Sequence, residues 1–177
     1  MSMTFKFNIL VSTPRNFERD AIAELDFLVH QIFPQEQFNY GRTIVKGLIW
    51  GNIVEVEPIL AVREIKSFVE RENFELQYLL KFVPIQEVLI NDLDKIEEYI
   101  LSQLDNIKPD EKFKMIVKKR RTHLKTIEII EKLTKNIEST VDLDNPDKII
   151  RVEIIGRYAG VSFLEKGDVF SIGKKIF

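Results

Sequence analysis

The spacing of hydrophobic residues divides the first half of the chain into strands and helices. Phe5, Phe7, Ile9 and Val11 occupy every second position, which is typical of a strand. Apolar residues then recur at helical spacing after Asn16, which we expect to cap that helix. The elements predicted here are strands at 5–12, 37–40, 43–50 and 74–80 and helices at 17–32 and 58–71. Their order, strand–helix–strand–strand–helix–strand, is that of a ferredoxin-like domain.

The second half of the chain predicts a further group of elements. Residues 149–155 are apolar on both faces, so we expect this strand to lie in the centre of a sheet. The elements predicted here are helices at 93–107 and 126–137, strands at 113–118 and 149–155, a return strand that ends at Leu164, and a short strand at 169–172. Pro84 marks a boundary. We therefore predict an α+β chain, with a ferredoxin-like domain at residues 1–82 packed against an α/β domain at residues 83–177.

Basic residues are concentrated in one stretch of the second domain. Residues 112–125 hold seven Lys or Arg and no acid, although the whole chain of 177 residues has 26 basic and 28 acidic residues. Positive charge concentrated where a strand ends and a helix begins suits the binding of a polyanion, and RNA or DNA is the leading candidate. The candidate RNA-binding residues are Lys112, Lys114, Lys118, Lys119, Arg120, Arg121, His123 and Lys125.

The same residues have more ordinary explanations. Lysines on an edge strand deter aggregation, which accounts for Lys112 and Lys114 but not for four consecutive cations at 118–121. A nuclear-import-like signal, or a surface that docks an acidic protein, stays open. If the ligand is a nucleic acid, Arg120 and Arg121 are favoured as phosphate ligands, because arginine can bind two phosphate oxygens at once.

The sequence lacks the usual signatures of catalysis. There is no cysteine, no glycine-rich phosphate loop and no GxSxG motif, and His30 and His123 have no metal-ligand spacing. The acidic residues of 142–147 do not fit a calcium loop, because Asp147 stands where glycine is needed, so we predict a turn held by Asp and Asn side chains. No apolar run would span a membrane, and the start lacks the pattern of a signal peptide. We expect a cytoplasmic binding protein with no catalytic residue, metal or cofactor.

Several motifs together resemble the THUMP domain of tRNA-modifying proteins. They are the basic strand KMIVKKRR at 114–121 and the stretch VDLDNPDKIIRVEIIGRYAGVSF at 141–163, and the resemblance covers about residues 83–172. This chain differs from the family at Thr122, where a small residue or glycine is usual, and at Leu124, where proline is common. In front, FNILVSTPRNFERDAIAEL resembles the ferredoxin-like domain that precedes THUMP in that family. The domain at 83–177 is then expected to be a THUMP domain.

The resemblance also implies a function. The methyltransferases and thiouridine synthases of the family carry further catalytic motifs that this sequence does not contain. What is left is similar to stand-alone THUMP proteins, which are non-catalytic adaptors that bind tRNA, near its acceptor end, for an RNA cytidine acetyltransferase that makes acetylcytidine in the D-arm. Two alternatives stay open, an RNA-binding subunit of another tRNA-modification enzyme and a plain protein-interaction domain.

Overall fold

The computed structural model describes residues 5–173, which form two compact units with one sheet each. Among the described residues, one unit comprises 5–85 together with 167–173, and the other comprises Gln86–Lys166. The described residues contain four α-helices, so the fold is mixed α and β in both units. Each unit has its own hydrophobic core.

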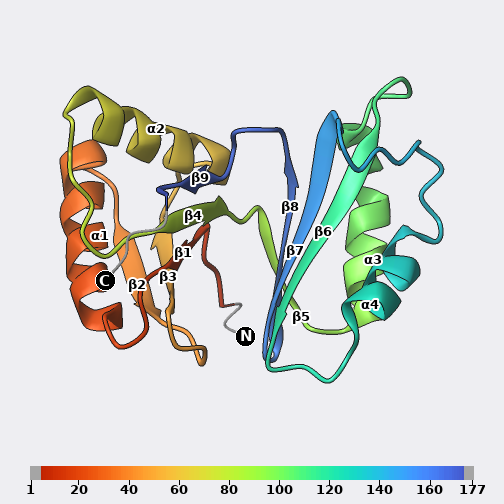
Figure 1. Cartoon of the computed structure of the whole chain (residues 1–177), viewed down its shortest axis with the longest axis horizontal. Helices are drawn as coiled ribbons and strands as arrows, with labels where there is room; N and C mark the ends of the chain where they lie inside the picture. Colours follow the sequence, from red (N-terminus) through yellow and green to blue (C-terminus); the bar gives the residue numbers. More distant parts are fainter. Residues whose placement is uncertain (1–4, 174–177) are drawn as a thin grey trace. The chain divides into compact units, whose positions relative to one another are not determined.

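The first unit is an antiparallel sheet with two helices packed against it (Figure 1). Its strands lie in the order β2-β3-β1-β4-β9, and each neighbouring pair is antiparallel. Its elements are β1 (Ile9–Ser12), α1 (Glu18–Ile32), β2 (Phe38–Arg42), β3 (Leu48–Ile53), α2 (Pro58–Arg71), β4 (Lys81–Pro84) and β9 (Phe170–Ser171). Fully buried Ile9, Leu25 and Ile65 join strand and helices in one core. As predicted, α2 begins at Pro58, and the Glu57 carboxylate accepts hydrogen bonds from its first turn.

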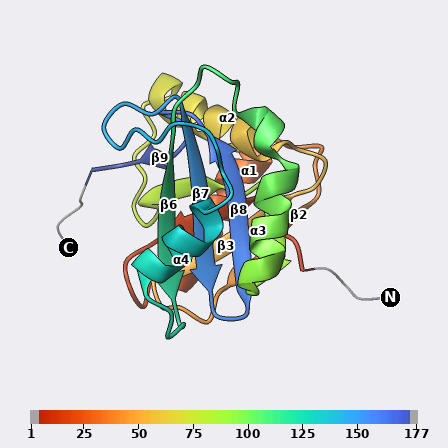
Figure 2. The ribbon, with the colours of Figure 1, turned by 90° about the vertical axis from the view of Figure 1, so that its right-hand side faces the viewer.

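The second unit is a four-stranded sheet whose helices, α3 and α4, lie in front of it in Figure 2. The strand order is β5-β8-β7-β6, so β7 is central, as predicted. Strands β6 and β7 are parallel and α4 crosses between them, whereas the other pairs are antiparallel. Its elements are β5 (Glu87–Ile90), α3 (Leu93–Ser102), the short 3₁₀ helix η1 (Leu104–Asn106), β6 (Phe113–Arg120), α4 (Thr126–Thr134), β7 (Lys148–Ile155) and β8 (Tyr158–Leu164).

The strand predicted at 74–80 is wrong, and this segment is a loop that leads into β4. Three consecutive backbone N–H groups of the loop, those of residues 77–79, donate to the carboxylate of Glu24 in α1 over 2.6–3.0 Å. A side chain therefore takes the place of a neighbouring strand as hydrogen-bond partner. The alternating apolar residues are explained by packing, because Leu76 is buried and Phe74 and Tyr78 lie against the same core.

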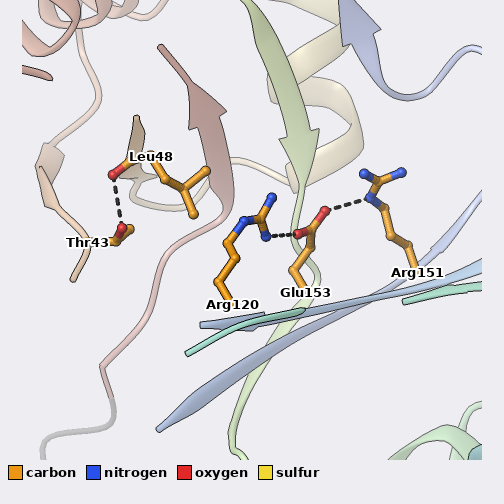
Figure 3. Close-up of polar contacts among 5 residues, drawn as sticks. All are labelled: Thr43, Leu48, Arg120, Arg151 and Glu153. Carbon is orange, nitrogen blue, oxygen red and sulfur yellow. Dashed lines mark hydrogen bonds and ion pairs between the residues drawn. The ribbon is translucent and has the colours of Figure 1, made fainter. Parts of the chain in front are cut away.

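The strand predicted at 43–50 begins later than its apolar residues indicate. Thr43 donates to the carbonyl of Leu48 through both its hydroxyl, at 3.0 Å, and its backbone N–H, at 3.2 Å, and this closes a loop before β3 (Figure 3). Gly47 in that loop has φ 79°, a left-handed conformation that suits glycine. The ladder between β2 and β3 therefore pairs Arg42 with Ile49 and extends to Ile53.

The predicted helix cap at Asn16 is also wrong. Asn16 has φ 73°, and α1 begins at Glu18 after Phe17, whose side chain makes no capping hydrogen bond. The Glu18 carboxylate instead accepts backbone hydrogen bonds from Gly47, at 2.6 Å, and from Asn16, at 3.3 Å. The bond from Gly47 is the main reason that the pKa of Glu18 is lowered. The helix therefore starts with an acidic side chain that ties down two loops.

The boundaries of the two units differ from the predicted 1–82 and 83–177. Residue 82 lies inside β4, and the short strand near the end, β9, pairs with β4 rather than with the second sheet. Phe170 of β9 stacks on Phe82 of β4 with ring centroids 5.5 Å apart, so an aromatic contact accompanies the pairing of these two strands. Strand β5, which the hydrophobic pattern did not predict, opens the second unit as a four-residue edge strand.

Candidate nucleic-acid interface

The basic residues predicted to bind RNA lie just before, on and after β6, the edge strand of the second sheet. Alternation along β6 buries Phe113, Met115 and Val117 in the core with α3 and α4. The alternation ends at Lys118 and Lys119, which are both exposed. A strand rises about 3.3 Å per residue, so the two ends of β6 are about 25 Å apart. The candidate residues therefore divide between two separate places.

At the start of β6, the acidic link of 142–147 holds the strand. The backbone N–H of Lys112 donates to the Asp147 carboxylate over 2.8 Å. Lys112 Nζ lies 3.5 Å from the Asp142 carboxylate, and Lys114 Nζ donates to the carbonyl of Leu143 at 3.5 Å. The positive charge of Lys112 is thus offset by a neighbouring acid, and Lys114 points to the same link.

The link itself is the turn that the sequence predicted. Asp142 Oδ1 accepts backbone hydrogen bonds from Asn145, at 2.9 Å, and Asp144, at 3.1 Å. These bonds, the one from Asn145 first, lower the pKa of Asp142, and Lys112 lowers it further. Within residues 5–173, no group of three or more His, Cys, Asp or Glu is arranged to hold a metal ion. The turn is therefore explained by its own backbone hydrogen bonds.

At the other end of β6, the ends of two parallel strands meet. Arg120 is paired in register with Ile155 of β7, and the Arg120 carbonyl accepts the N–H of Gly156 at 3.0 Å. Arg121 follows with φ 60°, a left-handed conformation that is strained for a residue with a Cβ. The resemblance to the THUMP domain places a small residue or glycine at position 122, which is Thr122 here. The left-handed backbone, which glycine would favour, is at Arg121 instead. The chain turns sharply here, and the basic residues of the loop lie at the end of the sheet where β6 and β7 both finish.

Helix α4 begins directly after this loop. The helical pattern was predicted to open at Thr126, with Thr126 as its cap, but Thr126 is the first helical residue and the cap position is Lys125, which makes no side-chain capping hydrogen bond. The backbone N–H of Lys125 donates to Glu128 Oε2 at 3.3 Å. The amino end of a helix carries partial positive charge, so α4 adds to the charge of the loop. His123 and Lys125 are both exposed beside it.

Arg120 differs from its neighbours because it is already bound to an acid (Figure 3). Its Nη1 donates to Glu153 Oε2 at 2.6 Å, and Arg151 Nε donates to Glu153 Oε1 at 2.8 Å. The side chains of Glu153 and Arg151 are 1 % and 7 % exposed, whereas that of Arg120 is 29 % exposed. A buried carboxylate therefore bridges two arginines, and the group keeps one net positive charge at the partly exposed end.

Glu153 and Arg151 were not predicted as site residues from the sequence. Both lie in β7, where after Lys148 they are the charged residues of an apolar run, at positions i and i+2 on the same face. Two opposite charges at that spacing in a central strand would have indicated a buried ion pair. The partner of Glu153 in β6 depends on register, because Lys118 is opposite Glu153 while Arg120 reaches it from two residues further on.

The other basic side chains at this end of β6 form no ion pair with any acid that the structure describes. Within residues 5–173, no ion pair involves the following five side chains: Lys118, Lys119, Arg121, His123 and Lys125. We call these five residues, which are four Lys or Arg and one histidine, the cation cluster. In contrast, Lys132 on α4 binds Asp94 of α3 at 2.8 Å, and this hydrogen bond raises the pKa of Lys132. Uncompensated positive charge is concentrated at the end of β6, where it can attract an anionic ligand.

Comparison with known proteins identifies the second unit. Residues 91–164 match the family model of the THUMP domain, so the chain contains a THUMP domain. No curated protein sequence matches the chain. No helix in residues 5–173 has the length and apolar character needed to span a membrane.

Solved structures show the same fold over both units. Protein PH1313 from Pyrococcus horikoshii Ot3 is similar with a TM-score of 0.57 at 17 % identity, over 90 % of this chain and 55 % of that one. TrmN from Thermus thermophilus is similar with a TM-score of 0.57 at 16 % identity, over 89 % of this chain and 45 % of that one. A 4-thiouridine synthetase, solved with RNA and ATP, has a TM-score of 0.55 at 15 % identity, over 94 % of this chain and 42 % of that one. This chain spans about half the length of these proteins.

Proposed function

We propose that this chain uses its THUMP domain to bind tRNA during tRNA modification. The observation that carries the proposal is the cation cluster, whose side chains have no acidic partner among the described residues of a chain that is acidic elsewhere. The likeness to a 4-thiouridine synthetase that was solved with RNA supports the same ligand class. Phosphate groups are the anions that such a surface meets in tRNA.

The geometry of the cluster suits contacts to the RNA backbone rather than to bases. Lys118 and Lys119 are compact charges at the end of a rigid strand, and Arg121 can place two N–H groups on one phosphate. The amino end of α4 offers further partial positive charge. Contacts of this kind release counterions, so binding should weaken steeply as salt is raised.

We further propose that the chain acts in the cytoplasm as a non-catalytic adaptor that presents tRNA, gripped near the acceptor end, to an RNA cytidine acetyltransferase. The sequence motifs at 114–121 and 141–163 support this function, because they resemble those of stand-alone THUMP proteins. The buried carboxylate beside the cluster, Glu153, accepts a hydrogen bond from an arginine on each oxygen. A carboxylate held in this way is better suited to positioning Arg120 than to removing a proton from a substrate.

We also propose that the first unit is a ferredoxin-like domain. It has the strand–helix–strand–strand–helix–strand order of that fold. Its first four strands lie in the order β2-β3-β1-β4, which is antiparallel throughout. The fifth strand, β9, is an addition at the edge next to β4.

A titration with labelled tRNA tests the binding step. Intact tRNA should bind more tightly than tRNA that lacks its single-stranded 3′ end, and the affinity should fall as salt rises. Indifference to RNA would contradict the proposal and favour the alternative of a protein-interaction domain. Equal affinity for both tRNAs would leave RNA binding intact and contradict recognition of the acceptor end.

A separate assay tests the adaptor step. Acetylcytidine in tRNA is measured with an RNA cytidine acetyltransferase alone, with this chain alone, and with both. The mixture should give more product than the enzyme alone, most clearly at low tRNA concentration, because capture raises the local concentration of the target. Product from this chain alone would make it an enzyme. Binding of tRNA without any enhancement would favour a subunit of another tRNA-modification enzyme.

A further inference from the structure

We propose that Arg157, in the turn between β7 and β8, binds a phosphate of the same RNA strand that the cation cluster holds. The inference rests on the proposed function and extends the RNA surface to a second segment of the chain. It rests on the position of the turn, on the hydrogen bonds that hold its backbone, and on the exposure of the Arg157 side chain. The ligand group is a phosphodiester of the RNA backbone.

The turn is placed beside the cation cluster by a backbone hydrogen bond. Parallel pairing brings Arg120 opposite Ile155, the last residue of β7, and Gly156, which follows it, donates its N–H to the Arg120 carbonyl at 3.0 Å. Arg121 and Arg157 are the residues that directly follow the two bonded groups. The two arginines therefore follow the ends of adjacent strands and lie at the same end of the sheet.

The backbone of the turn is fixed on both sides of Gly156. The turn is tight, because Ile155 and Tyr158 pair across it and only two residues lie between them. The Asn91 side chain donates to the Gly156 carbonyl at 3.0 Å, and the Asn91 N–H donates to the Arg157 carbonyl at 2.9 Å. Gly156 has φ 59°, which a glycine adopts without strain. Arg157 is thus presented from a rigid support, which reduces the entropy lost on binding.

The Arg157 side chain has the properties of an available phosphate ligand. It is exposed, and no ion pair of it is found within residues 5–173. Its guanidinium carbon lies 5.5 Å from the centroid of the Tyr158 ring, a cation–π contact that leaves the N–H groups at the rim of the guanidinium free to donate. Arg120 is different, because one of its nitrogens is committed to Glu153. Arg157 was missed in the sequence because it is a single cation between apolar strands.

Titration of the full chain with labelled tRNA at several salt concentrations tests the proposal. Arg157→Ala should lower the affinity about tenfold, as expected for loss of a charged hydrogen-bonded contact. It should also flatten the plot of log affinity against log salt by about 0.7–0.9. Arg157→Lys keeps the charge and should keep the slope of the wild type. Arg157→Gln is a second neutral variant, and it should behave as the alanine variant does.

A matched control removes a cation from the opposite end of β8. Lys166 is exposed and follows the end of that strand, whereas Arg157 precedes its start, so Lys166→Ala changes the net charge equally but away from the cluster. Circular dichroism shows whether each variant is folded. If Arg157→Ala and Arg157→Gln both bind as Lys166→Ala does while Arg121→Ala binds weakly, the inference about Arg157 is wrong and the proposed function stands. If the wild type does not bind tRNA, the proposed function itself fails.

Discussion

The two ends of β6 carry similar basic residues in different electrostatic surroundings. At the start, Lys112 lies beside Asp142, and Lys114 points to the carbonyl of Leu143. At the end, Lys118 and Lys119 have no ion pair among the described residues. The comparison shows that the number of cations in a segment does not determine its potential. What decides is which cations the fold brings next to an acid.

The largest change in stability should come from replacing Glu153. This residue binds Arg120, whereas the residues of the cation cluster form no ion pair among the described residues. Glu153→Ala leaves Arg151, 7 % exposed, without its partner, and removing one member of a buried ion pair costs about 3–5 kcal/mol. Urea unfolding measures the loss. The control Glu165→Ala removes the exposed member of the ion pair with the partly exposed Lys148 and should cost about 0–1 kcal/mol. Equal losses in the two variants would show that the Glu153 network does not stabilise the fold.

A pair of double mutants compares the two ends directly. Lys118→Ala with Lys119→Ala should flatten the dependence of log tRNA affinity on log salt by about 1.4–1.8, because two phosphate contacts are lost. Lys112→Ala with Lys114→Ala should leave the slope as it is in the wild type, since these lysines belong to the other end of β6. Fluorescence anisotropy with labelled tRNA gives both slopes. The same change of slope in both double mutants would mean that RNA covers the whole strand.

Arg121 allows the backbone of the cluster to be tested apart from its charge. Glycine accepts the left-handed conformation of φ 60° without strain, so Arg121→Gly should keep or raise the free energy of unfolding, by up to about 1 kcal/mol. The same variant should bind tRNA more weakly. Thr122→Gly is the control, because φ is not positive there and glycine should cost about 0.5–1 kcal/mol. A clear loss of stability in Arg121→Gly would contradict the assignment of strain to this residue.

The smallest expected effect is a change of stability with pH that is due to Asp142, near the start of β6. The pKa of Asp142 is lowered in the fold, chiefly by the backbone N–H of Asn145, so its carboxylate stabilises the native state above the ordinary aspartate pKa of about 3.9. That contribution is lost as pH falls through the lowered value. The difference in unfolding free energy between wild type and Asp142→Asn should be constant near neutral pH and shrink below about pH 4. A difference that grows on acidification would reverse the assigned direction.

The hydrophobic pattern predicted most elements correctly, because burial on one face sets a period that the sequence displays. It failed at 74–80, where Leu76 and Leu79 are buried in a loop. The backbone N–H groups that a strand would have used donate instead to the carboxylate of Glu24, which lies in α1. A pattern within the segment contains no information about such a partner.

The position of the basic residues at a strand end could be predicted for a similar reason. The basic cluster at the end of β6 is local in sequence, so composition was enough to find it. The pairing of Arg120 with Glu153 and the approach of Arg157 both depend on the register between β6 and β7. Register is a property of two distant segments, and residue spacing within either one does not determine it.

The position of β9 has a consequence for how the chain folds as it is made. Strands β1 to β4 of the first sheet are synthesised early, but among the described residues the strand that pairs with the outer edge of β4 is β9, whose Phe170 stacks on Phe82. The whole second unit, Gln86–Lys166, is made in between. During synthesis, therefore, β4 has a free hydrogen-bonding edge for as long as it takes to make that unit, and such an edge can pair with another chain. The first sheet to be started is the last to be completed.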